Sequence, residues 1–263
     1  MIPKAYILEW QKYAPWQTNA QVEQDLVIER ALIALFSNDM IRENLALRGG
    51  TALHKIFMKP QVRYSEDIDL VQIKSGPINP VMQEIKKAMS FLGSKRNTKQ
   101  NLRMNTIVYR FDTEIAPVIN SRLKLEINSR EHFSVLEWKK VNHQLISTWF
   151  TGSTDIISYE LEELLGTKLR ALYQRSKGRD LFDLYYSLVH QNPDCDKIIA
   201  CFKKYMEFST GKFCSAAVLL KNLDGKMLDP DFRGDTKGLL RPELDYDINL
   251  AYELVKKELI ERI

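Results

Sequence analysis

The hydrophobic periodicity of the chain changes near residue 155, and no other feature constrains its fold as strongly. Before that point, stretches such as MNTIVYRFD and SRLKLEINSR alternate apolar and polar residues, which is typical of strands with one buried face. After Ile157, apolar residues recur at helical spacing in SYELEELLGTKLRALYQ, RDLFDLYYSLVH, DCDKIIACFKKYMEF and INLAYELVKKELIERI. The sequence therefore predicts an α+β domain over residues 1–155, followed by a helical domain over residues 156–263.

The first 155 residues also contain helix signals, so the predicted sheet is a mixed one flanked by helices. A capped helix is indicated behind Thr18, in TNAQVEQDLVIERALIALFSND, and another between the prolines and the glycine of PINPVMQEIKKAMSFLG. Strand signals lie in NLALR, in RYSEDIDLVQI from about Glu66 to Ile73, and more weakly in HQLISTWF and DIISY. The stretch NLDGKMLDPDFRGDTKGLLRPELD is predicted to be a loop between the last helices.

The composition is that of an ordinary globular chain with a mild basic excess. Of the 263 residues, 44% are hydrophobic and 27% are charged, which allows a sizeable core. Lys and Arg outnumber Asp and Glu by 38 to 34, so a polyanionic partner is permitted but not required. The excess is local, and each basic cluster could follow a nucleic-acid backbone or simply be a solvated loop. The two clusters are Lys95, Arg96, Lys99 and Arg103, and Arg175, Lys177 and Arg179.

Cysteine usage and hydropathy favour a reducing environment away from membranes. The three cysteines are an odd number without metal-type spacing, and we interpret them as packing residues. The stretch MIPKAYILEWQKYAPW has acidic and aromatic residues where a signal peptide needs an apolar run, and no stretch reaches the ~18 apolar residues of a membrane span. We therefore expect a cytoplasmic protein without a membrane partner.

Two carboxylates lie on one face of a predicted strand. Side chains in a strand alternate between its faces, so Asp67 and Asp69 share one face while Ile68 and Leu70 share the other. Paired carboxylates require open water or a cation, and Mg²⁺ is commonly held by one or two carboxylates plus substrate phosphates. So short a pattern also arises by chance, and an acidic strand end facing solvent is the alternative.

A third carboxylate lies on a later predicted strand. In RLKLEIN the alternation places Lys124, Glu126 and Asn128 on one face and three apolar residues on the other. If this strand lies beside that of Asp67, three carboxylates converge, enough to hold two metal ions ~3.5–4 Å apart for in-line phosphoryl transfer. Taken alone, Glu126 would be a surface strand residue.

A glycine turn precedes both acidic strands, in LALRGGTALHKIF. It lacks the Lys-Ser/Thr of a P-loop and the spacing of a dinucleotide-binding turn. Gly49 and Gly50 permit close backbone approach, and Thr51 adds a hydroxyl. The helix that begins near Thr51 presents unpaired N–H groups to an anion. A strand, a glycine turn into a helix and an acidic strand, in that order, would place triphosphate oxygens beside two metals.

Together these residues resemble the nucleotidyltransferase fold of DNA polymerase beta type, whose signature is a glycine turn, a DxD strand and a third acid. More narrowly, LRGGTALHKIF, RYSEDIDL, LKLEIN and GTKLRALYQRSKGRDLFDLY resemble the AbiEii/AbiGii toxin family, to which the mycobacterial MenT toxins are related. The resemblance spans residues 45–190, and the helices after residue 195 carry no matching motif. It implies a polymerase-beta-like core followed by a C-terminal helical bundle that closes the cleft.

The resemblance also implies roles for individual residues. The implied catalytic residues are Asp67, Asp69, Glu126, Lys168 and Asp180, of which the three on strands are also the implied metal ligands. The implied nucleotide-binding residues are Arg48, Gly49, Gly50, Thr51, Ser65 and Arg179. Arg48 and Arg63 flank the site in sequence and could instead be plain surface arginines, and Ser65 could form only a local hydrogen bond.

The residue pattern of the later motif leaves its roles open. Lys168 falls inside an apolar helical stripe, so it either snorkels to solvent or extends into the cleft toward triphosphate. Asp180 and Asp183 lie one turn apart near a helix start, where they could act in the site or simply favour the helix dipole. Arg179 could pair with Asp183 or hold a phosphate.

The activity implied by the resemblance is Mg²⁺-dependent transfer of a nucleoside monophosphate from an NTP, using two ions and releasing pyrophosphate. In relatives the acceptor is the 3′ end of tRNA, whose blocking stops translation, as in abortive-infection phage defence. A cognate antitoxin is usually encoded nearby. The residues themselves leave open a protein or small-molecule acceptor, or a module that binds GTP or ATP without turnover.

Overall fold

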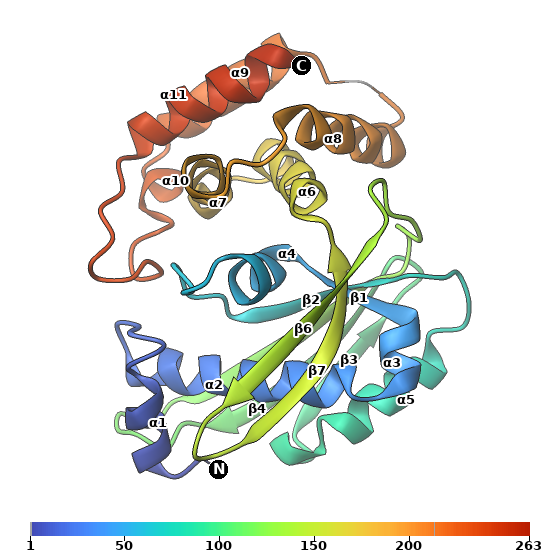
Figure 1. Ribbon diagram of the computed structural model, residues 1–263, viewed down its shortest axis with the longest axis vertical. Coiled ribbons are helices and arrows are strands. Elements are labelled where there is room, and N and C mark those ends of the chain that lie inside the picture. Colours follow the sequence, from blue (N-terminus) through green and yellow to red (C-terminus); the bar gives the residue numbers. More distant parts are fainter. Residues whose placement is uncertain (1, 213) are drawn as a thin grey trace. The chain divides into compact units, whose positions relative to one another are not determined.

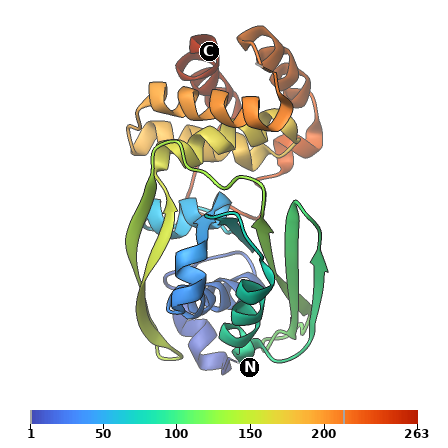
Figure 2. The same cartoon turned by 90° about the vertical axis from the view of Figure 1, so that its right-hand side faces the viewer.

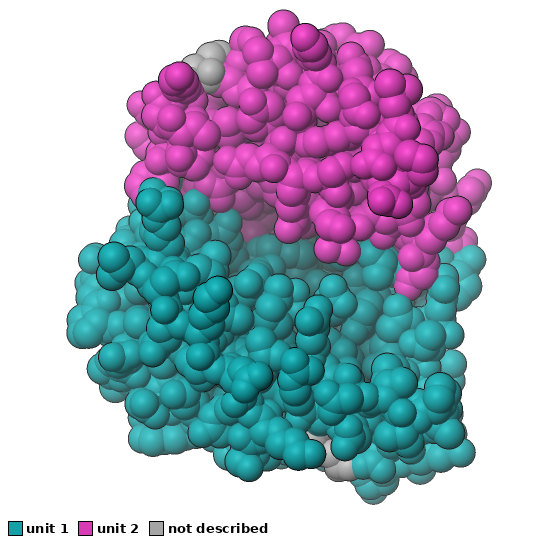
Figure 3. All heavy atoms as spheres, turned by 180° about the vertical axis from the view of Figure 1, so that it is seen from behind, with its two compact units in different colours: residues 1–133, 138–159, 239–242 teal, residues 134–137, 160–238, 243–263 magenta. Residues whose placement is uncertain are grey.

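The computed structural model describes residues 2–212 and 214–263, and the chain divides into two compact units (Figure 3). Unit 1 comprises Met1–Phe133, Trp138–Tyr159 and Leu239–Pro242, and unit 2 comprises Ser134–Glu137, Glu160–Gly238 and Glu243–Ile263. Each unit therefore contains one short segment whose neighbours in the chain belong to the other unit.

Unit 1 is built on a mixed sheet, in which the described residues form seven strands (Figures 1 and 2). The order is β3-β4-β5-β2-β1-β7-β6, with β2–β5 and β1–β7 parallel and the other pairs antiparallel. The strands are β1 (Leu45–Arg48), β2 (Asp67–Gln72), β3 (Arg96–Gln100), β4 (Met104–Asp112), β5 (Asn120–Asn128), β6 (Trp138–Ile146) and β7 (Thr151–Tyr159). The predicted mixed sheet is confirmed.

Helices flank this sheet, as the sequence predicts. Thr18 caps α2 (Asn19–Phe36) in a capping box with Gln21, and α2 packs on β5, β6 and β7 with Leu26 and Leu32 fully buried. The other helices of unit 1 are α1 (Lys4–Trp10), α3 (Asp39–Asn44), α4 (Gly49–Ala52), α5 (Asn79–Ala88) and a 3₁₀ turn (Ser90–Leu92). A π-helical turn (Leu53–Phe57) continues α4 directly.

Unit 2 is helical throughout its described secondary structure. Its helices are α6 (Leu161–Gln174), α7 (Gly178–His190), α8 (Cys195–Thr210), α9 (Ala216–Met227), α10 (Pro230–Gly234), α11 (Ile248–Glu258) and a terminal 3₁₀ turn (Ile260–Arg262). Helix α6 packs against α7 and α8, and α7 packs against α11. Among the described residues, no helix is long and apolar enough to cross a membrane.

One buried carboxylate holds the short segment Ser134–Glu137 in unit 2. Glu163 of α6 accepts hydrogen bonds from the Ser134 hydroxyl at 2.7 Å and from the Val135 and Leu136 backbone N–H groups at 2.9 and 2.8 Å. The Tyr205 hydroxyl of α8 donates a fourth at 2.7 Å. A fully buried acid is satisfied in this way by converging donors.

Backbone pairing likewise holds Leu239–Pro242 in unit 1. The Tyr64 N–H donates to the Leu239 carbonyl at 2.7 Å, and the Arg241 N–H donates to the Val62 carbonyl at 3.1 Å. The residues that lead into β2 are thereby paired with a segment from late in the chain.

The structure corrects two expectations about secondary structure. Residues 96–100, which carry part of a basic cluster, form the edge strand β3, although every residue in it is exposed and nothing in it alternates. The predicted loop of residues 222–245 contains the end of α9 and all of α10, because Asp229 caps α10 and Pro230 occupies its first turn.

Candidate active site

The strands that carry the three predicted acids are neighbours in the sheet. Strands β2 and β5 pair in parallel, with Asp69 opposite Glu126 and Asp67 opposite Lys124. Directly opposed residues project from the same face of a sheet, so all four side chains share one face. They are partly exposed, whereas Ile68 on the opposite face is fully buried. The structure therefore brings Asp67, Asp69 and Glu126 together.

Lys124 lies between two of these acids. Its Nζ is 3.0 Å from Asp67 Oδ2 and 3.2 Å from Glu126 Oε2. The alternation of the strand already places Lys124 on this face, but neither the alternation nor the family resemblance assigns Lys124 a role. A lysine two residues before an acid on one face of a strand is the sequence pattern that indicates such a contact.

The electrostatics of the site reflect crowded negative charge. Burial raises the pKa of Asp67 to about 6, and Asp69 and Glu66 add to this rise while Lys124 opposes it. Burial lowers the pKa of Lys124, but Asp67 and Glu126 outweigh that effect and raise it above its ordinary value. A site of this kind favours a cation among its carboxylates.

The glycine turn packs against the acids. Gly49 has a φ of +72°, and a Cβ added there would lie 3.0 Å from both Cβ and Cγ of Asp69 and closer still to its Oδ2. A Cβ at Gly50 would lie 2.8 Å from Arg63 Nη2 and 3.2 Å from Ser65 Oγ. Arg48, at the N-cap of α4, forms no side-chain capping hydrogen bond, and the first N–H groups of a helix are suited to an anion.

Thr51 and Ser65 lock the turn onto β2. The Thr51 hydroxyl donates to the Asp67 carbonyl and lies 2.9 Å from Ser65 Oγ, and Thr51 is fully buried. The hydroxyl that we expected to face phosphate is thus engaged inside the protein, because the turn packs its third residue against the start of β2. Only the backbone of Thr51 is left for an anion.

Arg48 ends β1 opposite Asp69 and is paired with another acid. Its Nη1 lies 2.6 Å from Glu131 Oε2, with the two side chains 14% and 7% exposed. Its guanidinium lies 6.0 Å from the ring of Tyr159, which stacks on Trp138. Arg48 is therefore an ordered, largely buried group rather than a plain surface arginine.

The predicted residues of the later motif form a buried ion-pair cluster within unit 2. Lys168 Nζ lies 3.0 Å from Asp180 Oδ1 and 2.7 Å from Asp183 Oδ2, and both aspartates are fully buried. Arg175 donates two hydrogen bonds to Asp180, of 2.7 and 2.9 Å. Burial alone would raise the pKa of Asp180, but the positive charges of Lys168 and Arg175 hold this pKa below its usual range.

These contacts show which of the alternative positions predicted for Lys168 and Arg179 the structure adopts. Lys168 does not snorkel, since its side chain is 6% exposed and its charge is met by two acids. The guanidinium of Arg179 lies 3.7 Å from Asp235, on the turn after α10, and the Arg179 N–H donates to the same carboxylate at 3.0 Å. The roles of Lys168, Asp180 and Arg179 in catalysis stay predictions.

The acids of β2 and β5 fit a hard divalent cation by their chemistry. Among the described residues, no group of three or more His, Cys, Asp or Glu side chains is already arranged as a metal site. The ammonium of Lys124 lies 3.0 Å from Asp67 and 3.2 Å from Glu126, where a cation would bind. The residues able to hold a metal are the three carboxylates, once Lys124 withdraws.

Known structures share this fold. JHP933 from Helicobacter pylori aligns with a TM-score of 0.55 and 18% identity, over 93% of this chain and 95% of that one. A putative nucleotidyltransferase from H. pylori aligns at 0.51 and 18%, over 94% and 99%. The nucleotidyltransferase toxin MenT4 from Mycobacterium tuberculosis aligns at 0.52 and 14%, over 100% and 98%. No curated protein sequence matches significantly.

A mixed sheet with a glycine turn beside paired acids defines the class of protein, a nucleotidyltransferase. Residues 30–254 match the family described as nucleotidyl transferase AbiEii toxin, type IV toxin–antitoxin system. The chain therefore belongs to the AbiEii family of nucleotidyltransferase toxins, as the motifs of its sequence predict.

Proposed function

We propose that this nucleotidyltransferase moves a nucleoside monophosphate from an NTP to the 3′ end of an RNA, with tRNA as the acceptor and arrest of translation as the outcome. The observation that carries the proposal is the register of β2 and β5, which sets Asp69 opposite Glu126 beside the Gly49 turn. Membership of a toxin family further implies a cognate antitoxin as partner.

The chain's own residues divide the work. Asp67, Asp69 and Glu126 would hold Mg²⁺, which supplies charge neutralisation at the phosphates and activation of the acceptor hydroxyl when bound. The N–H groups after Gly49 would receive the triphosphate oxygens, and Gly49 sets how closely they approach Asp69. Lys124 would release Asp67 and Glu126 on loading.

An exposed basic surface supports RNA as the acceptor. Thr106 of β4 lies opposite Glu126 on one side and Lys99 of β3 on the other, so Lys99 shares the face of the acids. Arg110 and Arg122 lie directly opposite one another on the same face.

The positive charges of these basic side chains are not balanced by nearby acids among the described residues. Lys99, Arg110 and Arg122 are exposed, and none forms an ion pair within residues 2–212 and 214–263. Like charges directly opposite on a sheet are destabilising, and a polyanion such as an RNA backbone would relieve the repulsion between Arg110 and Arg122. Because Lys99 is on a strand, the solvated-loop interpretation does not apply to it.

The test is a reaction of the full chain with each labelled NTP, Mg²⁺ and total tRNA. We expect label in RNA from at least one NTP, and none with Asp69→Asn. Arg110→Gln with Arg122→Gln should weaken labelling and its dependence on salt, whereas Lys74→Gln, an exposed lysine beyond the far end of β2, should not.

Other outcomes select the alternatives. Label in protein or in a small molecule would replace RNA as the acceptor while retaining the enzyme class. Saturable NTP binding without pyrophosphate release would instead support a nucleotide-sensing module. No product with any NTP, together with an equally harmless wild type and Asp69→Asn on expression, would refute the proposal.

A further inference from the structure

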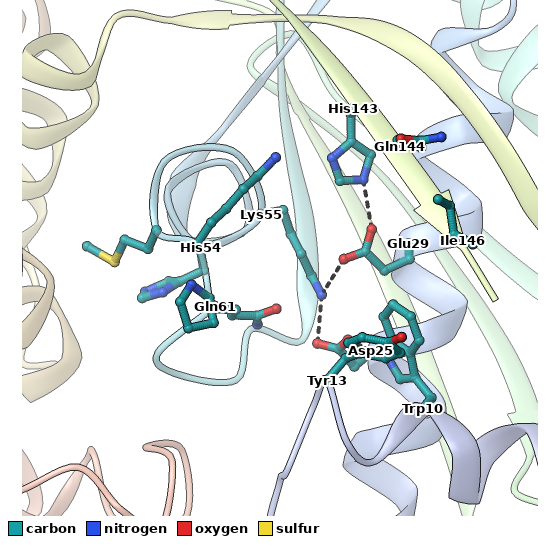
Figure 4. Close-up of a pocket in the computed structure, with 13 residues that line it drawn as sticks. Trp10, Tyr13, Asp25, Glu29, His54, Lys55, Gln61, His143, Gln144 and Ile146 are labelled. Atoms are coloured by element: carbon teal, nitrogen blue, oxygen red, sulfur yellow. Dashed lines mark hydrogen bonds and ion pairs between the residues drawn. The ribbon is translucent and has the colours of Figure 1, made fainter.

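A cavity of about 450 Å³ lies in unit 1 and includes none of the residues assigned to the active site (Figure 4). It is bounded by α1 and the loop after it, by α2, by the π-helical turn after α4 and the loop that follows, and by β6. Its size falls within the ~300–1,000 Å³ of pockets that take small organic ligands.

The floor of the cavity is a buried ion-pair network. Asp25 and Glu29 lie one turn apart on α2, and Lys55 reaches them from the π-helical turn (Figure 4). Lys55 Nζ is 2.7 Å from Asp25 Oδ2 and 2.9 Å from Glu29 Oε1, with the Lys55 side chain 2% exposed. Both acids are therefore paired with one buried ammonium and held in fixed orientations.

His143 of β6 completes the network and leaves one nitrogen unused. Its Nε2 lies 2.7 Å from Glu29 Oε2. Burial alone would raise the pKa of Glu29, but Lys55 and His143 hold this pKa at about 2. The Glu29 carboxylate therefore accepts the hydrogen bond, and Nε2 of His143 carries the proton. The Nδ1 atom is buried without a hydrogen-bond partner among the described residues, and in the neutral ring it is an acceptor.

The remaining hydrogen-bonding capacity identifies the edge that a ligand must present. Lys55 has three N–H groups and two carboxylate contacts, so one N–H group remains as a donor in the cavity that His143 also lines. Every carboxylate oxygen is engaged, since Asp25 Oδ1 accepts from the Trp10 indole at 2.9 Å. Two carboxylates face one ammonium in the floor, which therefore has no surplus positive charge to attract a phosphate, and the other lysine that lines the cavity, Lys59, is exposed.

The walls identify the body of the ligand. Trp10 and Tyr13 line the cavity with their rings 5.1 Å apart, and Met58, Pro60 and Ile146 add apolar surface. Aromatic and apolar walls of this kind favour a flat, uncharged ring that stacks on them.

We propose that this cavity binds a nucleobase, with its ring against Trp10 and Tyr13 and its polar edge against His143 Nδ1 and the Lys55 ammonium. Nucleobases carry an N–H donor beside a ring nitrogen or carbonyl acceptor, which complements one acceptor and one donor. The phosphates of a nucleotide would remain outside the cavity. The inference is independent of the reaction at the carboxylates, because the two sites share no residue.

The test uses the full chain without metal and the four nucleosides adenosine, guanosine, cytidine and uridine. Calorimetry measures affinity, and the indole N–H resonance of Trp10, identified with Trp10→Phe, reports where the ligand binds. We expect saturable binding of at least one nucleoside with a shift of this resonance. Asp67→Asn should bind the same nucleoside unchanged, which separates this site from the carboxylates.

Variants of the cavity decide the matter. Tyr13→Ala, at a side chain 53% exposed, should weaken binding about tenfold. Leu8→Ala is the matched control, since Leu8 is similarly exposed on α1 and does not line the cavity. His143→Phe keeps the ring volume and should abolish binding. No saturable binding up to the solubility limit, or binding unaffected by Tyr13→Ala and lost in Asp67→Asn, would overturn the proposal.

Discussion

Substituting the first glycine of the turn should disable the site while leaving the protein folded. In Gly49→Ala, the residue keeps a φ of +72°, a conformation that costs a non-glycine residue ~1–2 kcal/mol. Part of this cost is offset, because alanine has less backbone entropy to lose on folding, by ~0.4–1 kcal/mol. The conformational term alone therefore lowers the free energy of unfolding by ~1 kcal/mol.

The larger effect concerns Asp69. The new Cβ would lie 3.0 Å from Asp69 Cβ and Cγ, whereas ordinary contact begins at 3.4 Å, so these atoms must withdraw by at least 0.4 Å (3.4 − 3.0). The carboxylate oxygen, which lies nearer, must withdraw further. Because a misplacement of ~1 Å in a catalytic group can cost ~100-fold in rate, we expect a loss of at least ~10-fold.

Gly211→Ala provides the matched control. Gly211 ends α8 with a φ of +65°, and a Cβ there would meet nothing within 4 Å. Both variants should lose the same conformational contribution to stability in urea denaturation, Gly49→Ala should lose more because of its clash with Asp69, and only Gly49→Ala should lose NTP turnover. Full turnover in Gly49→Ala, or an equal loss of turnover in both variants, would refute the assignment of Asp69 to the site.

Three further outcomes follow from the charges. Lys124→Met leaves Asp67 and Glu126 facing each other, so metal-free protein should lose ~1 kcal/mol of stability that Mg²⁺ restores; an equal loss with and without Mg²⁺ in thermal melts would contradict this. The folded state binds the Asp67 proton more tightly than the unfolded state, with a pKa of about 6 against 3.8, so metal-free stability should fall as pH rises from ~4 to ~6. Asp67→Asn should flatten that dependence in urea titrations run with a chelator. Lys168→Met removes the ammonium that two buried carboxylates share, although Asp180 keeps Arg175, and should cost ~3 kcal/mol, whereas the exposed Lys177→Met should cost almost nothing by the same assay.

The parts of the site that depend on local rules could be predicted from the sequence. Alternation predicted a strand from about Glu66 to Ile73, and β2 spans Asp67–Gln72 with its acids on the open face. Turn chemistry likewise indicated Gly49, whose positive φ requires glycine. The pairing of β2 with β5 belongs to the tertiary structure, and no local sequence pattern indicates which strands pair.

The missed features leave no local pattern in the sequence. The strand β3 has no buried face, so its pairing with β4 leaves no hydrophobic period to detect. Lys168 meets Asp180 and Asp183 across two helices, which a single-helix stripe cannot show. His143 pairs with Glu29, which lies 114 residues away, and no local spacing indicates such a pair.

The acids of the site are constrained in two different ways, and this difference bears on how a metal would enter. Asp69 is constrained sterically, because it lies so close to the backbone of Gly49 that no side chain fits between them. Lys124 restrains Asp67 and Glu126 electrostatically. Its side chain is flexible and 29% exposed, so its ammonium can move into solvent. Loading a cation between Asp67 and Glu126 therefore requires that Lys124 rotate away. In the metal-free protein one ammonium offsets part of the negative charge of these two acids, while the glycine turn allows Asp69 to lie directly against the backbone at Gly49.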